Sequence, residues 1–480
     1  MKRTFLTISL VFYCILVSAQ NDTSRLGGSR LSLRQCIETG LKNNLDVLQS
    51  ELTMQSDRIN MNQSKLNLLP DLNGSASHSF SQGRSIDPYS NTPVTQNVSA
   101  SNFSLNSGVI LFNGLALQNT IKQNSLLYQA SRMDWQQVKD NLTINIILAY
   151  LQVLSSDDQL SQAKNQAALS GEQVNRLEIL NRQGAIRPSD LSDLKGQYAS
   201  DQVDIINMQN ALETAKISLC NLMNVPYDPA MTLEPIEAEA YIVKYESTRE
   251  QIYQNALKEL SLVKAADFRE QSAEKAVKVA RGFLFPTLSF GASISTNYSS
   301  VAQQNEFVST SYVPTTDTAV GNNIKLPVYR FQDNFTPYSK IPYMDQINNN
   351  VFTSYGFTLR VPIFNALVQR NRVKQAKLNL QNQHYVASTT RTELGRRVDQ
   401  AYVNMLSAYD RYKVTLDQVT AFTESFHAAE IRFNSGVGTS VDYLVVKNSL
   451  DRANLALITV KYDYVLRTKV LDFYQGKQLW

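Results

Sequence analysis

Two acidic side chains follow glycine-containing breaks in stretches that otherwise have the pattern of long helices. Asp190 follows Gly184 in the segment NRQGAIRPSDL, and Asp442 follows Gly436 in the segment FNSGVGTSVDYL. Carboxylates gathered into a ring favour the passage of cations. The same residues have a purely structural explanation, because an acidic side chain stabilises the positively charged first turn of a helix. The sequence leaves both explanations open.

The other residues that could carry chemistry form no catalytic or metal-binding pattern. His78, His384 and His427 do not have the spacing of metal ligands. The sequence contains no nucleophile elbow, phosphate-binding loop or paired-cysteine site. We therefore expect no enzymatic activity, no cofactor, no catalytic residue and no metal-ligating residue. Cys36 and Cys220 fit either a disulfide or two isolated buried thiols.

The first residues have the pattern of a secretory signal. Lys2 and Arg3 precede the short apolar run Thr4–Val17, and the small residues that end it predict a Sec signal peptide over residues 1–19. An anchoring helix is the alternative, but the run is shorter than the ~20 residues that a membrane span needs. Cys14 lies inside the apolar run without a cleavage pattern before it, so we expect no lipidation.

Composition limits the class of protein further. The 480 residues carry a formal charge of +4, which falls to +2 (4 − 2) without Lys2 and Arg3. Such a balance argues against nucleic acid as a partner. Beyond the leader, no run is long and apolar enough to cross a bilayer as a helix. A location in a membrane would therefore require strands closed into a barrel.

Motifs recur at two fixed offsets along the chain. LLPDL and LFPTL place Pro70 and Pro286 at equivalent positions, with an offset of 216 (286 − 70). LFNG and IFNA place Asn113 and Asn365 at an offset of 252 (365 − 113), and the same offset relates Gly184 to Gly436. A long stretch held in one register predicts a tandem duplication. The offsets differ by 36 (252 − 216), which predicts an insertion in the second copy.

The duplication sets the predicted domain organisation. The first repeat covers residues 20–224, a linker or equatorial segment covers 225–247, and the second repeat covers 248–480. Within the repeats we expect strand hairpins at about 70–111 and about 286–363, and helical turns at about 182–190 and about 434–442.

Each repeat opens with a predicted helix, Ser32–Leu69 in the first copy and Thr248–Leu284 in the second. After Pro286 the pattern changes to alternation, with Leu288, Phe290, Ala292 and Ile294 on one face and small polar residues on the other. Strands of this kind match a membrane barrel with apolar residues toward lipid and polar residues toward a water-filled lumen. A soluble sandwich edge is the alternative.

Four such strands per chain cannot enclose a lumen, so several protomers should share one barrel. Arg360 belongs to the polar face of the last strand and is expected to face the lumen, where it either tunes selectivity or stays solvated. The segment of about 299–350 contains the insertion and is rich in Tyr, Pro, Asn and Thr. We expect it to be a long extracellular loop.

A heptad pattern predicts coiled-coil hairpins in both repeats. The outgoing helix from about Gly114 to Gly184 has ~70 residues, or ~105 Å. The opening helix (~38 residues) and the return helix (~34) sum to about the same length, so we expect them to stack end to end along it. The outgoing seam includes Leu142, Ile146, Ala149, Val153, Ser156, Leu160, Ala163, Ala167, Ser170, Val174 and Leu177; the return seam includes Leu191, Leu194, Tyr198, Asp201 and Ile205.

Both turns have residues suited to reversing a helix. Gly184, Gly436 and Gly438 are expected to supply positive φ angles. Pro188 is expected to end the helical backbone register of the first outgoing helix, because proline has no N–H to donate. Ser189 and Thr439 are the expected caps of the return helices.

Together these features resemble the TolC family of outer-membrane efflux ducts. The resemblance covers about Leu31 to Tyr474 and rests on the leader, the duplication, the order of elements, and the opening segment LSLRQCIETGLKNNLDVL. It implies a mixed, mostly helical fold: a homotrimer with a 12-stranded outer-membrane β-barrel, four strands per chain, and a long periplasmic coiled-coil α-helical barrel. It implies a passive duct of a tripartite efflux or type I secretion system in a Gram-negative cell. The implied partners are a periplasmic adaptor (membrane fusion) protein, an inner-membrane pump of the RND or ABC type, and outer-membrane lipid.

The resemblance also assigns roles at the turns. The residues implied to dock the adaptor are Gly184, Ala185, Ile186, Ser189, Gly436, Val437, Gly438 and Thr439, and those implied to form the periplasmic entrance are Asp190 and Asp442. Packing within the hairpin is an alternative role for the apolar residues near the turns, which are Ala185, Ile186, Val437 and Tyr443. The chain departs from the family pattern at Leu45, Val441 and Val445, where members often have proline, a hydroxyl residue and a further acid.

A second class of function fits part of the pattern. A coiled-coil structural or adhesive outer-membrane protein would also have long helical hairpins. The duct predicts ion conductance from the purified protein, whereas the scaffold predicts none. The exported substrate and the pump class do not follow from the sequence.

Overall fold

The computed structural model describes residues 30–86, 91–95, 97–236, 242–305, 307–321, 324–335 and 339–477. The predicted signal peptide and Cys14 lie outside the described residues. The chain divides into two compact units, and each takes segments from both repeats. The first unit is drawn from Met1–Ser56, Gln129–Phe268 and Tyr385–Trp480, and the second from Asp57–Tyr128 and Arg269–His384.

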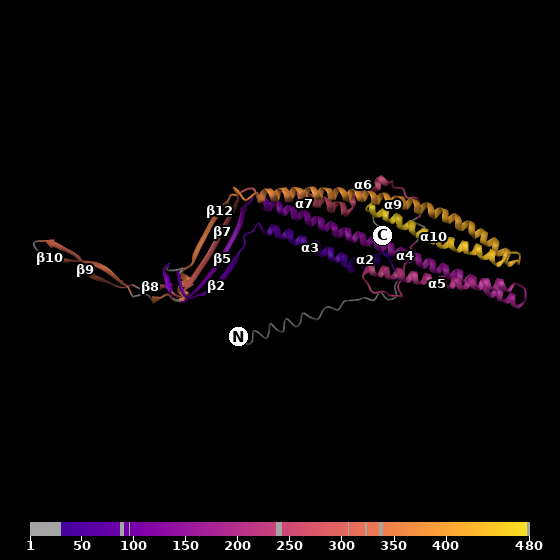
Figure 1. The fold of residues 1–480 in the computed structure, drawn as a ribbon, viewed down its shortest axis with the longest axis horizontal. Helices are drawn as coiled ribbons and strands as arrows, with labels where there is room; N and C mark the ends of the chain where they lie inside the picture. The colour runs from indigo at the N-terminus through magenta and orange to yellow at the C-terminus, as the bar shows by residue number, and fades with distance from the viewer. Residues whose placement is uncertain are drawn as a thin grey trace, which may run out of the picture. The chain divides into compact units, whose positions relative to one another are not determined.

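The helices repeat with the offsets found in the sequence (Figure 1). Helices α2 (Leu33–Asn43) and α3 (Leu45–Leu66) correspond to α6 (Arg249–Glu259) and α7 (Ser261–Gly282), with an offset of 216 (249 − 33). The long helices α4 (Ala116–Arg182) and α9 (Val368–Asn434) differ by 252 (368 − 116), as do the first residues of α5 (Pro188–Met223) and α10 (Ser440–Tyr474). The tandem duplication is therefore present in the fold.

The opening helix of each repeat is two helices, so the prediction of one continuous helix was wrong. The chain is extended at Asn44 (φ −68°, ψ 126°) and at Leu260 (φ −68°, ψ 131°). At the first break the Asn44 carboxamide oxygen accepts a hydrogen bond from the backbone N–H of Asp46 (3.0 Å), which caps α3. Asparagine competes with the helical backbone in this way and so favours caps over helix interiors.

The return helix α5 ends at the same break. Asn224 takes a left-handed conformation (φ 51°) and donates from Nδ2 to the Asn43 carbonyl (3.0 Å). Asn44 donates in turn from Nδ2 to the carbonyl of Leu222 (3.1 Å). The end of α5 therefore meets the start of α3, as expected for two short helices stacked end to end.

The predicted heptad seam forms the core of the first unit. Tyr150 is fully buried beside it, and its hydroxyl lies 3.1 Å from the carbonyl oxygen of Leu31 and 2.6 Å from that of Glu234. Cys36 and Cys220 are free and buried, and burial raises the pKa of the Cys36 thiol to about 12. The seam residues of α4 that are buried are Leu142, Ile146, Val153, Ser156, Leu160, Ala163, Ala167, Ser170, Val174 and Leu177.

The linker joins this unit through a short strand. β6 (Thr232–Leu233) pairs in parallel with β1 (Arg30–Leu31), just before the first helix. Ser32 then begins α2 with a capping box, in which its hydroxyl accepts from the Gln35 N–H and the Gln35 side chain accepts from the Ser32 N–H. Thr248 and Gln251 repeat this arrangement at the start of α6.

The second unit contains a four-stranded antiparallel sheet in the order β12-β7-β5-β2. Its strands are β2 (Asn73–Ser81), β5 (Val98–Phe112), β7 (Thr287–Ser299) and β12 (Phe352–Arg360), which confirms the predicted strand pairs. The two repeats meet where β5 pairs with β7. Every side chain of the two outer strands, β2 and β12, is exposed.

The segment of about 299–350, predicted as a long extracellular loop, contains regular secondary structure. Strands β9 (Phe307–Gly321) and β10 (Ile324–Phe335) form an antiparallel two-stranded ribbon (Figure 1). The short strands β8 (Gln303–Gln304) and β11 (Ser339–Lys340) and helix α8 (Tyr343–Asn349) flank it. Aromatic and β-branched residues alternate with polar ones along the ribbon, and this pattern favours strands even where Pro and Asn are frequent. The corresponding hairpin of the first repeat is short: β3 (Arg84–Ile86) with β4 (Pro93–Thr95).

Within the described residues, no helix combines the length and the apolar character needed to cross a membrane.

Candidate functional site at the hairpin turns

Both outgoing helices end in the same glycine motif. Gly184 has φ +70° and Gly436 has φ +77°, as the sequence predicted. The Ala185 N–H donates to the Leu180 carbonyl (2.9 Å) and the Gly184 N–H to that of Asn181 (2.9 Å), and equivalent bonds recur in the second turn. This is a Schellman motif, in which glycine takes the left-handed position. Gly438 is not in the left-handed region, so that part of the expectation was wrong.

The two return helices begin differently. Thr439 caps α10 in a capping box with Asp442, whose N–H donates to the Thr439 hydroxyl oxygen (3.2 Å). In the first turn the capping position is Arg187, which makes no side-chain cap, and Pro188 is the first helical residue. Proline suits that position because its φ is already helical and its missing N–H is not needed there. Pro188 therefore starts the return helix rather than ending the outgoing one, and Ser189 is not a cap.

The two predicted entrance carboxylates consequently have different roles in the chain. Asp442 is exposed and accepts hydrogen bonds from the N–H (3.4 Å) and the hydroxyl (2.7 Å) of Thr439. Asp190 stands at the equivalent position of the first turn, where no threonine is available. Asp190 Oδ1 instead accepts a hydrogen bond from the hydroxyl of Ser440 (2.8 Å), a buried residue of the other turn. The same hydroxyl oxygen lies 3.0 Å from Asp193 Oδ2. Asp190 thus joins the turns, whereas Asp442 caps its own helix.

The apolar residues near the turns separate into a packed set and an exposed set. A small core between the hairpins contains Val174, Leu177, Leu194 and Tyr443, and the partly buried Ile186 packs against it. Hairpin packing therefore accounts for Ile186. Ala185 is exposed, and Val437 is 80% exposed. In the single chain, both apolar side chains are therefore accessible to a partner protein.

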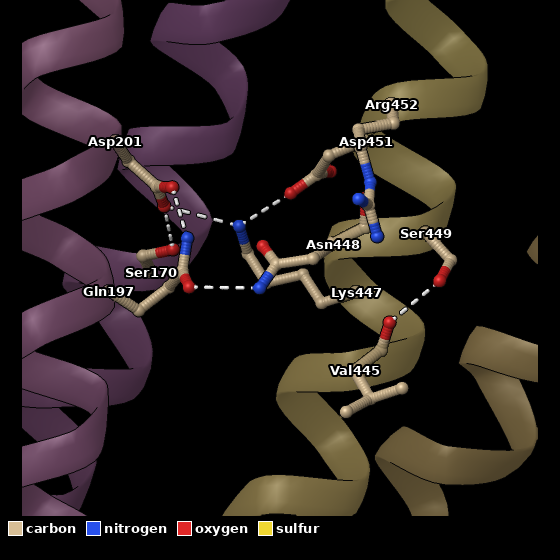
Figure 2. Close-up of polar contacts among 9 residues, drawn as sticks. All are labelled: Ser170, Gln197, Asp201, Val445, Lys447, Asn448, Ser449, Asp451 and Arg452. Atoms are coloured by element: carbon tan, nitrogen blue, oxygen red, sulfur yellow. Dashed lines mark hydrogen bonds and ion pairs between the residues drawn. The ribbon is translucent and has the colours of Figure 1, made fainter.

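A buried lysine connects the return helices of the two repeats. Lys447 of α10 is 3% exposed, and its ammonium lies 3.1 Å from Asp201 Oδ2 of α5 and 2.7 Å from Asp451 Oδ2. Figure 2 shows the lysine reaching between the two carboxylates. Burial raises the pKa of the Asp451 carboxyl, and the neighbouring Lys447 opposes that shift.

Neutral polar side chains complete this network (Figure 2). The Ser170 hydroxyl of α4 donates to Asp201, and Gln197 Nε2 donates to the other Asp201 oxygen (2.7 Å). Asn448 Nδ2 donates to Gln197 Oε1 (3.1 Å). The network therefore spans α4, α5 and α10. The sequence contains one signal of this network, because Asp201 is a charged residue in an otherwise apolar and neutral heptad seam.

The remaining predicted site residue, Arg360, is the exposed last residue of β12 and pairs with Thr287. The histidines lie apart. His78 contacts the hydroxyls of Ser101 (2.8 Å) and Ser99 (3.1 Å), and His384 contacts Glu270 (2.9 Å). Among the described residues, no three His, Cys, Asp or Glu side chains form a group that could hold a metal ion.

Comparison with known proteins gives the family. The family described as outer membrane efflux protein matches the chain twice, over residues 36–225 and 252–476, once for each repeat. An uncharacterised Haemophilus influenzae protein is 22% identical over 437 residues, which cover 90% of this chain and 84% of that protein. The chain belongs to the outer membrane efflux protein family.

Solved structures agree with this fold. A structure of CusC, described as a transmembrane channel, aligns with a TM-score of 0.74 at 18% identity, covering 93% of this chain and 92% of CusC. The outer membrane protein VceC of Vibrio cholerae aligns with a TM-score of 0.73 at 15% identity, covering 93% of this chain and 97% of VceC. The family description names efflux, and the description of CusC names the formation of a transmembrane channel. The chain is accordingly an outer membrane efflux protein.

We predict that Lys447→Met destabilises the turn region. Removal of one member of a buried ion pair leaves the other charge unpaired and costs about 3 kcal/mol or more. Amide hydrogen exchange over 188–201 and 440–451 should accelerate by about a hundredfold, since about 1.4 kcal/mol corresponds to a factor of ten.

Lys195 provides the matched control, because it is the equivalent of Lys447 in the first repeat, at the same offset of 252 (447 − 195). Lys195 forms a salt bridge with Glu178 (2.8 Å), and its side chain is 52% exposed. An exposed pair contributes about 0–1 kcal/mol, so Lys195→Met should change exchange little. Equal effects of the two substitutions would contradict the role assigned to the buried network.

Proposed function

We propose that three copies of this chain close one barrel and form a continuous duct from the periplasm to the cell exterior. The observation that supports this most directly is the sheet β12-β7-β5-β2, whose outer strands have no partner on one side within the described residues. Unpaired backbone groups cannot be left in hydrocarbon. Because four antiparallel strands alternate in direction, β12 of one copy runs antiparallel to β2 of an identical neighbour. The sheet of each copy can therefore continue into the sheet of the next copy.

The number of copies follows from the size of the lumen. Two copies would give eight strands, and a barrel of that size is just wide enough to be filled by its own side chains. Three copies give 12 strands (3 × 4) and leave room for a water-filled passage. The outer strands have nine residues each, about the length that a tilted strand needs to cross a bilayer.

The lining of the proposed lumen is the small polar face of the sheet. Gly356, Gly291 and Gly108 lie in register across β12, β7 and β5 and form a row without side chains. Ser354 and Ser293 flank this row, and their hydroxyls lie 2.8 Å apart. Phe357 and Phe290 contact each other across the opposite, lipid-facing side of the sheet, with ring centroids 5.1 Å apart. Arg360 extends the polar face at the end of β12 and would tune ion selectivity there.

The hairpin turns are the proposed periplasmic end. There, Ala185 and Val437 dock an adaptor protein, which connects the duct to an inner-membrane pump of the RND or ABC type. The exposed glycines and Thr439 shape this surface. Asp442, repeated by symmetry, places carboxylates at the entrance, while Asp190 mainly holds the two turns together. The leader over residues 1–19 directs export through the inner membrane, and the long helices cross the periplasm.

A tryptophan at Gly356 should narrow the duct. A Cβ at this position meets no atom within 4 Å, so the chain has room for a side chain. We predict that Gly356→Trp lowers single-channel conductance in planar bilayers by about half or more, since three indoles would enter one lumen. Phe357→Trp on the opposite face is the matched control and should conduct normally. The proposed lumen is wrong if Gly356→Trp conducts like the unsubstituted protein.

Asp442→Asn tests the entrance. If the carboxylates attract cations, their removal should weaken the block of conductance by divalent cations added from the periplasmic side. Thr439→Ala separates charge from capping, because it removes the cap partner and keeps the carboxylate. We expect block to persist in Thr439→Ala and to decline in Asp442→Asn. If divalent cations block Asp442→Asn as strongly as the unsubstituted protein, the entrance role is refuted and helix capping is the role of Asp442.

Charged substitutions test adaptor docking. Ala185→Asp and Val437→Asp place a carboxylate on an apolar contact surface, and desolvating it costs several kcal/mol. We predict loss of drug export in cells with normal amounts of trimer in the outer membrane. Val437→Ala keeps the surface apolar and should export normally. Full export by both aspartate variants would refute the docking role.

A further inference from the structure

The β9–β10 ribbon is much longer than its counterpart in the first repeat, and it has no part in the duct described above. It contains Phe307–Gly321 and Ile324–Phe335, whereas the equivalent strands β3 and β4 have three residues each. An isolated two-stranded hairpin is at best marginally stable in water. The ribbon therefore needs an explanation for its length.

One side of the ribbon is aromatic. Tyr312 pairs with Phe331, and their ring centroids are 4.3 Å apart. A shift of register between Asn334 and Phe335 brings Phe335 opposite Phe307, with ring centroids 6.0 Å apart. We use the term aromatic face for the five residues Phe307, Tyr312, Tyr329, Phe331 and Phe335.

The opposite side of the ribbon is polar. Ser311 pairs with Gln332, and Ser309 pairs with Asn334. Asn334 Nδ2 donates to the Ser311 hydroxyl (2.9 Å), which satisfies polar groups within this polar face. An alternation of apolar and polar faces is the pattern of a sheet with one face covered.

No part of the described chain provides that cover. The five aromatic residues are between 50% and 69% exposed. At roughly 150–250 Å² per aromatic side chain, the exposed rings present roughly 500 Å² of apolar surface. Patches of this size on soluble surfaces mark sites of interaction. Among the described elements, β9 makes extensive contacts only with β10.

The base of the ribbon is fixed to the membrane sheet. Gln346 of α8 accepts from the Ser299 N–H (2.9 Å) and donates to the carbonyls of Ser299 (3.0 Å) and Ile341 (2.8 Å). Ser300 then donates from its N–H to the carbonyl of Ser99 (2.8 Å). The ribbon thus starts from the ends of β7 and β5, the central strands of the sheet.

We propose that the aromatic faces of the ribbons from the three copies pack against one another outside the barrel. This inference rests on the proposed trimer. Three ribbons anchored at one barrel rim have a high effective concentration for each other, so even weak contacts between them form. The aromatic face carries one nearby charge, Asp333, which accepts a hydrogen bond from Thr310 (2.8 Å). Identical faces therefore meet with little like-charge repulsion.

The distribution of basic residues favours another copy over a lipid surface. Elements that lie on membranes combine apolar residues with Lys and Arg that reach the head groups. Arg330 pairs with Val313 on the polar face, away from the aromatic rings. Lys325 lies beyond the register shift near the ribbon end, opposite Val320. The aromatic face itself has no basic residue.

Cysteine cross-linking tests the proposal with two adjacent positions. Thr310→Cys places a thiol on the aromatic side and Ser311→Cys places one on the polar side. The mature protein is a suitable background, because Cys14 belongs to the proposed leader and Cys36 and Cys220 are free and buried. Purified trimers treated with a short bis-maleimide should give covalent dimers and trimers several-fold more efficiently from Thr310→Cys. Equal yields from both positions, or none from either, overturn the proposal.

Proteolysis gives an independent readout. Trypsin cuts after Lys325 and Arg330, and packed ribbons should resist it. Tyr312→Ser combined with Phe331→Ser should raise the cleavage rate several-fold, whereas Ser311→Ala combined with Gln332→Ala should not. Cleavage at the same rate in all three proteins contradicts the proposal.

The oligomeric state separates this inference from the proposed function. A variant with residues 307–335 replaced by a short Gly-Ser linker should still form a trimer and conduct ions. If full-length trimers conduct ions but Thr310→Cys cross-links no better than Ser311→Cys, the contact between ribbons is refuted and the duct is not. If neither the full-length protein nor the linker variant forms trimers, the proposed duct is refuted.

Discussion

A four-stranded sheet whose edge strands have no partner among the described residues is the constraint on which the proposed duct depends. In a membrane, hydrocarbon would offer the outer backbone groups of β12 and β2 no hydrogen-bond partner. The duplication supplies two strands from each repeat, joined between β5 and β7. In the proposed trimer, identical neighbours supply the remaining pairs, so that assembly and the formation of a passage are one event.

The helical part has a different requirement, because each chain must hold two long hairpins in a defined relation. Apolar packing around Tyr443 and the buried small seam residues Ala163 and Ala167 contribute contact area. Such apolar contacts are non-directional, whereas buried polar groups require defined partners. Lys447 is satisfied only when α5 and α10 bring Asp201 and Asp451 to it together. Such networks specify one arrangement more than they add stability.

Much of this fold follows from the sequence, since repeated offsets and alternation are local signals. The shared glycine turns at Gly184 and Gly436 and the strands of the sheet were predicted from them. The break at Asn44 was missed because its side chain makes contacts with another helix. The bond between Ser440 and Asp190 and the burial of Lys447 also depend on tertiary proximity. Equivalent residues such as Lys195 and Lys447 show that similar sequence positions acquire different surroundings.

The central claim is that three open-edged sheets make one conducting barrel. Native mass spectrometry of the detergent-extracted protein, applied to the same fraction that conducts in planar bilayers, measures the number of chains in the active species. The account predicts three chains and conductance from that fraction. Conductance from a fraction with one or two chains, or a three-chain species that does not conduct, would contradict it.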